Sequence, residues 1–175
     1  MEIFQTERLI VRQYAPGEFD NFFMLNGDEE VVRYIRPVQT REEALTSFQQ
    51  LLSDYEAQPG LGRWAAHLQS TREFVGSFAI IPVPWDIEKI QIGYAFPKSS
   101  WGKGYATELT QAGLQHYWSH FTNEVVYGMT EIPNVASQKV LLKAGFQFET
   151  TTMDKDIELY VYACRRHHQE GSSGV

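Results

Sequence analysis

The stretch of residues 90–107 constrains the fold of this chain more than any other part of its sequence. Residues 90–96 read as a β-strand that Pro97 stops, a loop of small residues follows, and an amphipathic helix begins after the loop. Gly102 and Gly104 let the loop backbone turn tightly and approach a ligand closely. Because the free amides at the start of a helix lie at the positive end of its dipole, the stretch predicts a cradle for an anion such as phosphate.

The spacing within the loop excludes one common phosphate site and disfavours another. A mononucleotide P-loop needs a lysine after its last glycine, whereas Lys103 lies between the two glycines. The dinucleotide fingerprint normally opens a series of βαβ units, but this loop lies past the middle of the chain, behind several strand-like segments. A pair of glycines alone is also typical of an ordinary tight turn, so the identification depends on the rest of the chain.

Three blocks of sequence resemble the GNAT superfamily of acyl-coenzyme A dependent N-acetyltransferases. The family's phosphate loop runs Q/R-x-x-G-x-G/A, and residues 101–106, W-G-K-G-Y-A, are similar to it with Trp101 in the first position. Residues 134–146 resemble the pattern N-x-x-S-x-x-V-L-x-K-x-G-F of the branch that acetylates the N-termini of ribosomal proteins. Residues 6–12, T-E-R-L-I-V-R, are typical of the first strand of that branch. The blocks occur in the family's order and cover nearly the whole chain.

The residue pattern and the resemblance both predict an α+β fold. A capping-box pattern that begins at Thr40 predicts a helix. Strand-like runs at residues 64–68, 74–81 and 88–96 predict an antiparallel meander, after which strands and helices alternate and a hairpin closes the domain. In the resembled family this central sheet is mixed and flanked by helices. Its strand before the phosphate loop runs parallel to the strand after the loop helix, and the pair splays apart at the coenzyme A site.

Length and composition indicate one domain. The chain has 175 residues, of which 43% are hydrophobic, which is enough for one substantial core. We assign residues 1–166 to a single GNAT acetyltransferase domain. Residues 167–175 end in G-S-S-G-V, and we expect them to form a disordered tail.

The resemblance implies acetyl-coenzyme A as the cosubstrate and no metal. Backbone groups on the splayed strand lose their ladder partners and can bond pantetheine, which places Tyr94, Ala95 and Phe96 at the ligand. The candidate phosphate ligands belong to the loop and the first helical turn, and are Gly102, Lys103, Gly104, Tyr105, Ala106 and Thr107. Asn134 is expected to bond a pantetheine amide, with capping of the following helix as the alternative.

The catalytic groups of many family members are incomplete in this chain. Leu141 occupies the position where many members carry a general-acid tyrosine, and Gln91 occupies the position of a frequent glutamate. Ser137, which the ribosomal-protein branch offers near the leaving thiolate, is the candidate acid, with helix capping as the alternative. Glu131 is the candidate general base and Glu88 the second choice, with an ordinary solvated carboxylate or a water chain as alternatives.

An N-terminal α-amine would need little help from a base. Its pKa of about 8 leaves part of it neutral at pH 7, whereas a lysine side chain at about 10.4 has to be deprotonated. We therefore expect transfer of acetyl from acetyl-coenzyme A to the N-terminal amine of a protein or peptide, with a ribosomal protein as one candidate acceptor. Acetylation of a small amine, such as a polyamine, an amino acid derivative or an antibiotic, is one alternative. A non-catalytic coenzyme A-binding module is the other.

Charge and composition limit the partners and the compartment. The formal net charge is -7 and no basic run stands out, so a nucleic-acid partner is not expected. The N-terminus lacks a signal-peptide pattern and no apolar run approaches ~20 residues, so we expect a cytoplasmic protein with no membrane segment. Cys164, the only cysteine, lies in an apolar run and is expected to be a buried strand thiol. A homodimer is left open, because the sequence does not fix the oligomeric state.

Overall fold

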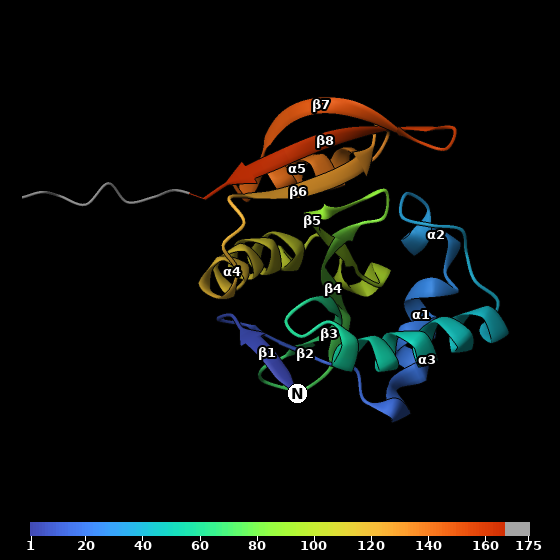
Figure 1. The fold of residues 1–175 in the computed structure, drawn as a ribbon. Coiled ribbons are helices and arrows are strands. Elements are labelled where there is room, and N and C mark those ends of the chain that lie inside the picture. The colour runs from blue at the N-terminus through green and yellow to red at the C-terminus, as the bar shows by residue number, and fades with distance from the viewer. Residues whose placement is uncertain (167–175) are drawn as a thin grey trace, which may run out of the picture.

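An open mixed sheet of eight strands organises the computed structural model, which describes residues 1–166 (Figure 1). The strands are β1 (Glu2–Gln5), β2 (Leu9–Arg12), β3 (Gly62–Leu68), β4 (Phe74–Val83), β5 (Asp86–Ala95), β6 (Val125–Glu131), β7 (Gln147–Asp154) and β8 (Ile157–Arg165). The helical segments are η1 (Pro16–Glu18), α1 (Phe19–Asn26), α2 (Glu29–Val32), α3 (Arg41–Ala57), η2 (Lys98–Ser100), α4 (Tyr105–His120) and α5 (Val135–Lys143). The spatial order of the strands is β1-β2-β3-β4-β5-β6-β8-β7, and each neighbouring pair is antiparallel except β5 and β6.

Helices α4 and α5 pack closely on one face of the sheet. Gly113 brings α4 so near to β4 that a Cβ there would lie 2.3 Å from the ring of Phe78. At the other contact Leu141 of α5 lies against Gly128 of β6, where an added Cβ would meet the leucine at 2.4 Å. Each of these contacts is close because one of its two positions is a glycine, which has no side chain.

The other face of the sheet is covered by α1, α2 and α3, which lie on the right in Figure 1. Phe22 of α1 and Phe48 of α3 form an apolar cluster there with Tyr14 and with Ala65 of β3. This cluster covers the β2–β3 side of the sheet. The helices thus leave the same face of the sheet less covered over β5 and β6, so a binding site has room there.

Strands β5 and β6 are joined over a short distance only. Their parallel pairing is limited to Gln91 with Tyr127 and Ile92 with Gly128, although both strands continue for three more residues, to Ala95 and Glu131. Beyond the last pair the two strands part. Backbone groups that face the gap have no ladder partner across it, which leaves them free to bond a ligand.

The α+β fold predicted from the sequence is confirmed, including the meander, the parallel pair and the closing hairpin. Thr40 caps α3, and its side chain and that of Glu43 bond each other's backbone amides in the predicted capping box. The predicted burial of Cys164 is also confirmed, since it lies in β8 with 6% of its surface exposed, and this burial raises the pKa of its thiol.

Of the strands and α-helices, two were not predicted, namely β1 and α2. Each has only four residues, which is too short for a periodic pattern to show in the sequence. The predicted tail at residues 167–175 lies outside the described residues. None of the helices within residues 1–166 is both long and apolar enough to cross a membrane.

The packing of α4 predicts that Gly113→Ala destabilises the protein. In an exposed helix this change would stabilise by about 1 kcal/mol. Here the new methyl group would overlap the buried Phe78 ring, and overpacking of this kind costs about 1–3 kcal/mol. We expect net destabilisation in urea unfolding, with Gly17→Ala as the matched control because no atom lies within 4 Å of a Cβ at that position. A Gly113→Ala protein more stable than the wild type would contradict the close α4–β4 contact.

Candidate active site

The loop before α4 turns through two glycines in the left-handed region. Gly102 has φ of 72° and Gly104 has φ of 82°, and Gly104 is also the N-cap of α4. Among residues 1–166, no backbone N–H of residues 102–107 donates to a protein acceptor. These amides lie at the start of a 16-residue helix, where the helix dipole favours negative charge. The predicted anion cradle therefore has both the backbone shape and the free donors that it needs.

A network from the N-terminal segment holds this loop in place. The carboxylate of Glu108, in the first turn of α4, accepts from the Thr6 hydroxyl and from both the backbone and the guanidinium of Arg8. Arg8 also donates to the carbonyl of Lys103 and lies 4.9 Å from the centre of the Tyr105 ring. Burial alone would raise the pKa of Glu108, but the bonds from Thr6 and Arg8 outweigh it and lower that pKa. The carboxylate is thus kept charged, and its hydrogen bonds connect the segment before β2 to the first turn of α4.

A cavity of about 660 Å³ opens where β5 and β6 part. Because side chains alternate along a strand, Tyr94 points to the α4–α5 face, while Gln91 and Gly93 point to the opposite face. The cavity is lined from both faces, so it passes through the sheet, and we refer to it as the cleft. A Cβ on Gly93 would meet only the Cβ of Ala79, at 4.0 Å, so this part of the cleft floor is open.

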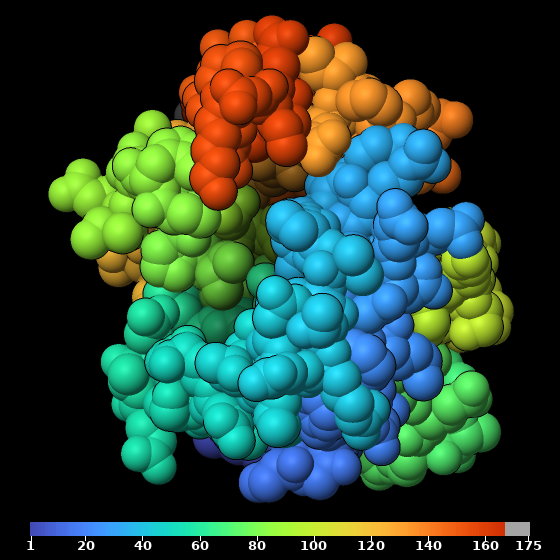
Figure 2. Space-filling model, turned by 90° about the vertical axis from the view of Figure 1, so that its right-hand side faces the viewer, coloured from blue at the N-terminus to red at the C-terminus, as the bar shows by residue number. Residues whose placement is uncertain are grey.

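The mouth of the cleft is visible on the face that α1 to α3 cover. Figure 2 shows a hollow there between the light green β4–β5 turn, the red-orange β7–β8 turn and the light blue segment of residues 33–37. The aromatic side chains of Tyr34 and Trp85 line the cleft, whereas those of Trp64 and Tyr55 belong to the core. Two of the connecting segments therefore supply an aromatic side chain to the mouth.

Two hydroxyl groups meet at the inner end of the cleft. The Tyr94 hydroxyl lies 2.9 Å from the Ser137 Oγ, and both residues line the cleft. Burial raises the pKa of Tyr94 to about 12, although the hydrogen bond with Ser137 acts in the opposite sense. The phenol therefore keeps its proton at neutral pH and can donate it in a hydrogen bond.

Asn134, not Ser137, caps α5. Its Oδ1 accepts from the backbone N–H of Ser137 at 3.1 Å, so the capping alternative for the serine side chain is wrong. Asn134 does cap α5, which is the alternative that the sequence left open for this residue. Its amide nitrogen makes no hydrogen bond within residues 1–166, and the residue lines the cleft, which leaves a donor available there.

The carboxylate candidates fall into different places. Glu131, at the end of β6, lines the cleft and is half-buried, whereas Glu88 is exposed and lies outside the cleft lining. Gln91 lines the cleft as well, so the position of the family's frequent glutamate is indeed at the site. Asp154, at the end of β7, is a second cleft carboxylate that we did not predict. Its sequence surroundings carry no signal, because its role depends on how the hairpin is placed.

Only some of the residues that we predicted to bind the cofactor line the cleft. Tyr94 and Ala95 line the cleft, but Phe96 does not, since its ring is buried against Tyr105 and its carbonyl accepts from the indole of Trp101 at 2.7 Å. Within residues 1–166 no group of three His, Cys, Asp or Glu side chains is placed to hold a metal ion. The cleft thus offers hydroxyl, amide, carboxylate and backbone groups for chemistry.

Comparison with known proteins gives a consistent result. The family model of the GNAT acetyltransferase domain matches residues 8–147. The uncharacterised N-acetyltransferase YoaA of Bacillus subtilis is 27% identical over 149 residues, which cover 84% of each chain.

Two solved structures share the fold. One is an acetyltransferase of Salmonella typhimurium that modifies the N-terminal serine of the ribosomal protein L7/L12, with a TM-score of 0.78, 18% identity, and coverage of 95% of this chain and all of that one. The other is the spermidine N-acetyltransferase of Vibrio cholerae in complex with CoA and spermine, with a TM-score of 0.74, 14% identity, and coverage of 90% of this chain and 95% of that one.

Proposed function

This chain belongs to the GNAT acetyltransferase family, and from that premise we propose that it acetylates the α-amino group of a protein or peptide. Its cosubstrate is acetyl-coenzyme A, which supplies the acetyl group as a thioester. The observation that carries the proposal is the cleft through the sheet. It brings the Tyr94–Ser137 hydroxyl pair on one face together with Glu131 and Gln91 on the other, so that donor and acceptor can approach from opposite sides.

The loop and the strand gap fit the two polar parts of coenzyme A. The free amides of residues 102–107 would bond the pyrophosphate. The backbone of Tyr94, which faces the gap, would bond an amide of pantetheine in the manner of an added strand, whereas the Ala95 carbonyl lies toward β4; the Asn134 side-chain amide would add a donor. These roles need only groups that have no other partner within residues 1–166.

Ser137 would stabilise the thiolate that leaves in the reaction. The amine nitrogen forms a bond to the thioester carbon while the carbon–sulfur bond breaks, and the sulfur takes up a proton. When Tyr94 donates to the Ser137 Oγ, the serine hydroxyl proton is free to point toward the sulfur. Tyr94 acts here through Ser137, as a positioning residue that takes the place of the tyrosine replaced by Leu141.

Glu131 is the proposed acceptor of the amine proton. It lies on the face of the sheet opposite to Tyr94 and lines the cleft without a side-chain partner within residues 1–166. Removal of this proton is a small task for an α-amine, whose pKa of about 8 lies near ambient pH. The site therefore suits an N-terminal amine better than a lysine side chain.

Cofactor binding is tested at Gly104. Gly104→Val should lower the affinity for coenzyme A at least ~10-fold, about 1.4 kcal/mol, because valine disfavours φ of 82° and its Cβ would approach Arg8 to 3.4 Å. Calorimetry measures the affinity and circular dichroism confirms that the protein folds. Gly17→Val, at a site with no atom within 4 Å of a Cβ, is the control. Unchanged affinity in a folded Gly104→Val protein would rule out the loop as the phosphate site.

The hydroxyl pair is tested by two substitutions. Ser137→Ala should reduce kcat by ~10²-fold with little change in coenzyme A affinity, because it removes a donor that acts only as charge develops on sulfur. Tyr94→Phe should give a smaller loss, since the serine hydroxyl remains but is no longer oriented. Steady-state kinetics with saturating peptide separates the two. A Ser137→Ala enzyme with full activity would show that the pair is structural only.

The preference for an α-amine is tested with two forms of one peptide. A peptide with a free N-terminus should react much faster at pH 7 than the same peptide with a blocked N-terminus and a free lysine. Each pKa unit above ambient pH costs about 1.4 kcal/mol to deprotonate the amine, which amounts to several kcal/mol against lysine. The rate should rise with pH until the α-amine has titrated, and Glu131→Gln should alter this profile if Glu131 is the base. Equal or faster lysine acetylation would refute the proposal.

A further inference from the structure

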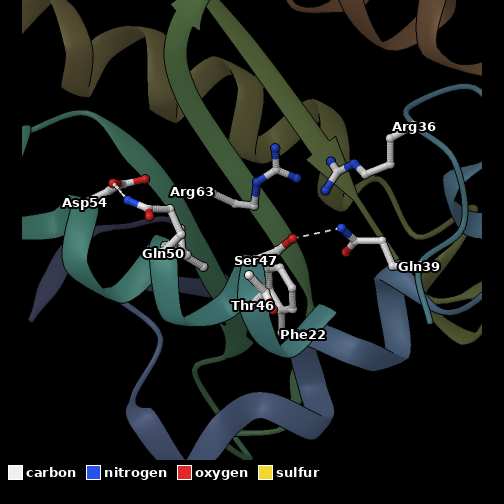
Figure 3. A pocket seen from close by; sticks show the side chains of 9 residues that line it. Phe22, Arg36, Gln39, Thr46, Ser47, Gln50, Asp54 and Arg63 are labelled. Atoms are coloured by element: carbon white, nitrogen blue, oxygen red, sulfur yellow. Dashed lines mark hydrogen bonds between the residues drawn. The ribbon is translucent and has the colours of Figure 1, made fainter. Parts of the chain in front are cut away.

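Arg36 and Arg63 lie where the cleft meets a second cavity. This second cavity, of about 440 Å³, lies between α3 and β3, and the two arginines line both cavities. Figure 3 shows their guanidinium groups turned toward each other across the space, with Gln39 and Ser47 bonded to each other below them. Two cationic groups from separate parts of the chain thus converge on one point.

Neither arginine has a carboxylate partner within residues 1–166. Arg36 donates to the Asn26 Oδ1 at 2.7 Å, and the Arg63 guanidinium makes no hydrogen bond or ion pair there. Asp54 lines the second cavity but accepts from Gln50 instead. Other arginines of the chain do pair with acids, as Arg12 does with Glu18 at 2.6 Å.

The pair is held at an electrostatic cost. Burial and, to a smaller extent, the charge of Arg63 lower the pKa of Arg36 to about 9; burial also lowers the pKa of Arg63. Cations in a partly desolvated site are normally paired, because an uncompensated charge there is unfavourable. An anion that entered the cleft would relieve this cost by bonding both guanidinium groups, whose fork geometry suits a carboxylate.

The charge of the whole cleft also favours an anionic ligand. Four cationic side chains line it, with Arg33 and Lys155 in addition to the pair, against the carboxylates Glu131 and Asp154. This excess of positive charge occurs in a chain whose formal net charge is -7. A polyamine acceptor would be repelled by such a lining, so the small polycationic acceptors are disfavoured.

Strand register sets the distance between the arginine pair and the site of reaction. Arg63 pairs across β3 and β4 with Ala79, and Ala79 pairs across β4 and β5 with Gly93, at the point where β5 leaves β6. These three positions share one face of the sheet, and two strand spacings amount to roughly 10 Å. An extended peptide covers that distance in about three residues. The small side chains of the middle positions leave this path clear.

We infer that Arg36 and Arg63 bind a carboxylate of the acceptor, and that the enzyme therefore selects amines with an acidic group within the first four residues of the acceptor peptide. This inference rests on the proposed function, since it names the acceptor class of the same site. The same chemistry would also recognise the α-carboxylate of a free amino acid. The experiment therefore includes both sources of the carboxylate.

The test compares amidated peptides Ser-Ala-Xaa-Ala in which Xaa is Glu, Gln or Lys, and free serine with serinamide. We expect kcat/KM to be at least 10-fold higher for Glu than for Gln, mainly through KM, and lowest for Lys. Arg63→Gln and Arg36→Gln should bring the Glu to Gln ratio close to one, while Lys139→Gln, an exposed charge outside both cavities, should leave it unchanged.

A serine preference over serinamide that disappears in the same variants would identify the free amino acid as the acceptor. Absence of a preference in both pairs, or one that persists in both arginine variants, would overturn the inference.

A binding measurement separates this inference from the proposed function. Calorimetry with the acetylated peptides, which need no turnover, should show tighter binding of the Glu form by the wild type and equal binding by Arg63→Gln. If no peptide is acetylated but this difference persists, the carboxylate site stands and the acceptor amine was wrongly assigned. Equal affinities in the wild type would refute the site.

A thermal unfolding measurement distinguishes ligand binding from a structural role of the arginine. Removal of an unpaired, partly buried charge should leave the Tm of Arg63→Gln unchanged or higher, whereas loss of a structural arginine would lower it. Arg63→Lys, which keeps the charge but not the fork, should retain part of the Glu preference.

Discussion

The parting of β5 and β6 after two residue pairs is the constraint on which the rest of the site depends. If the ladder continued to Ala95 and Glu131, the backbone groups there would be consumed by the sheet and the cleft would be closed. The pairing of β6 with β8 instead runs along the whole strand, and α5 is fixed to β6 through the Gly128–Leu141 contact. The sheet therefore divides into two halves, β1 to β5 and β6 to β8, that are joined at one short seam. Donor and acceptor sites both follow from this seam, since one face of it carries Ser137 and the other carries Glu131.

The Glu108 network connects the other end of the donor site to the same sheet. Its partners, Thr6 and Arg8, are 102 and 100 residues away in the chain, at the turn into β2. The segments T-E-R, residues 6–8, and W-G-K-G-Y-A-T-E, residues 101–108, are thus connected physically, because the side chains of Thr6 and Arg8 bond that of Glu108. An N-terminal segment that seemed to specify only a strand also sets the position of the phosphate loop.

Local patterns explain which parts of this structure could be predicted from the sequence. A few adjacent residues are enough to indicate the capping box of Thr40, the strand from Val125 to Glu131 and the loop glycines. The order of such elements along the chain then indicates the fold class. The Tyr94–Ser137 contact could not be predicted in this way, because the two residues are 43 positions apart and meet only through the packing of α5 on the sheet. The same holds for Arg36 and Arg63, neither of which lies in a motif. Side chains whose role depends on tertiary placement leave no local signal.

The cationic lining of the cleft and the absence of a strong base are linked. Positive charges near an amine favour its neutral form, because they disfavour the ammonium. Two guanidinium groups exceed the single carboxylate that they would bind, so with such an acceptor in place the lining still carries excess positive charge from Arg36 and Arg63, besides Arg33 and Lys155. The amine of an acceptor held by its carboxylate would lie roughly 10 Å from this pair, in a cleft whose four cations outnumber the carboxylates Glu131 and Asp154. The arginines would then serve mainly the selection of the acceptor, and their charge would add to the preference for a neutral amine that the low pKa of an α-amine already provides.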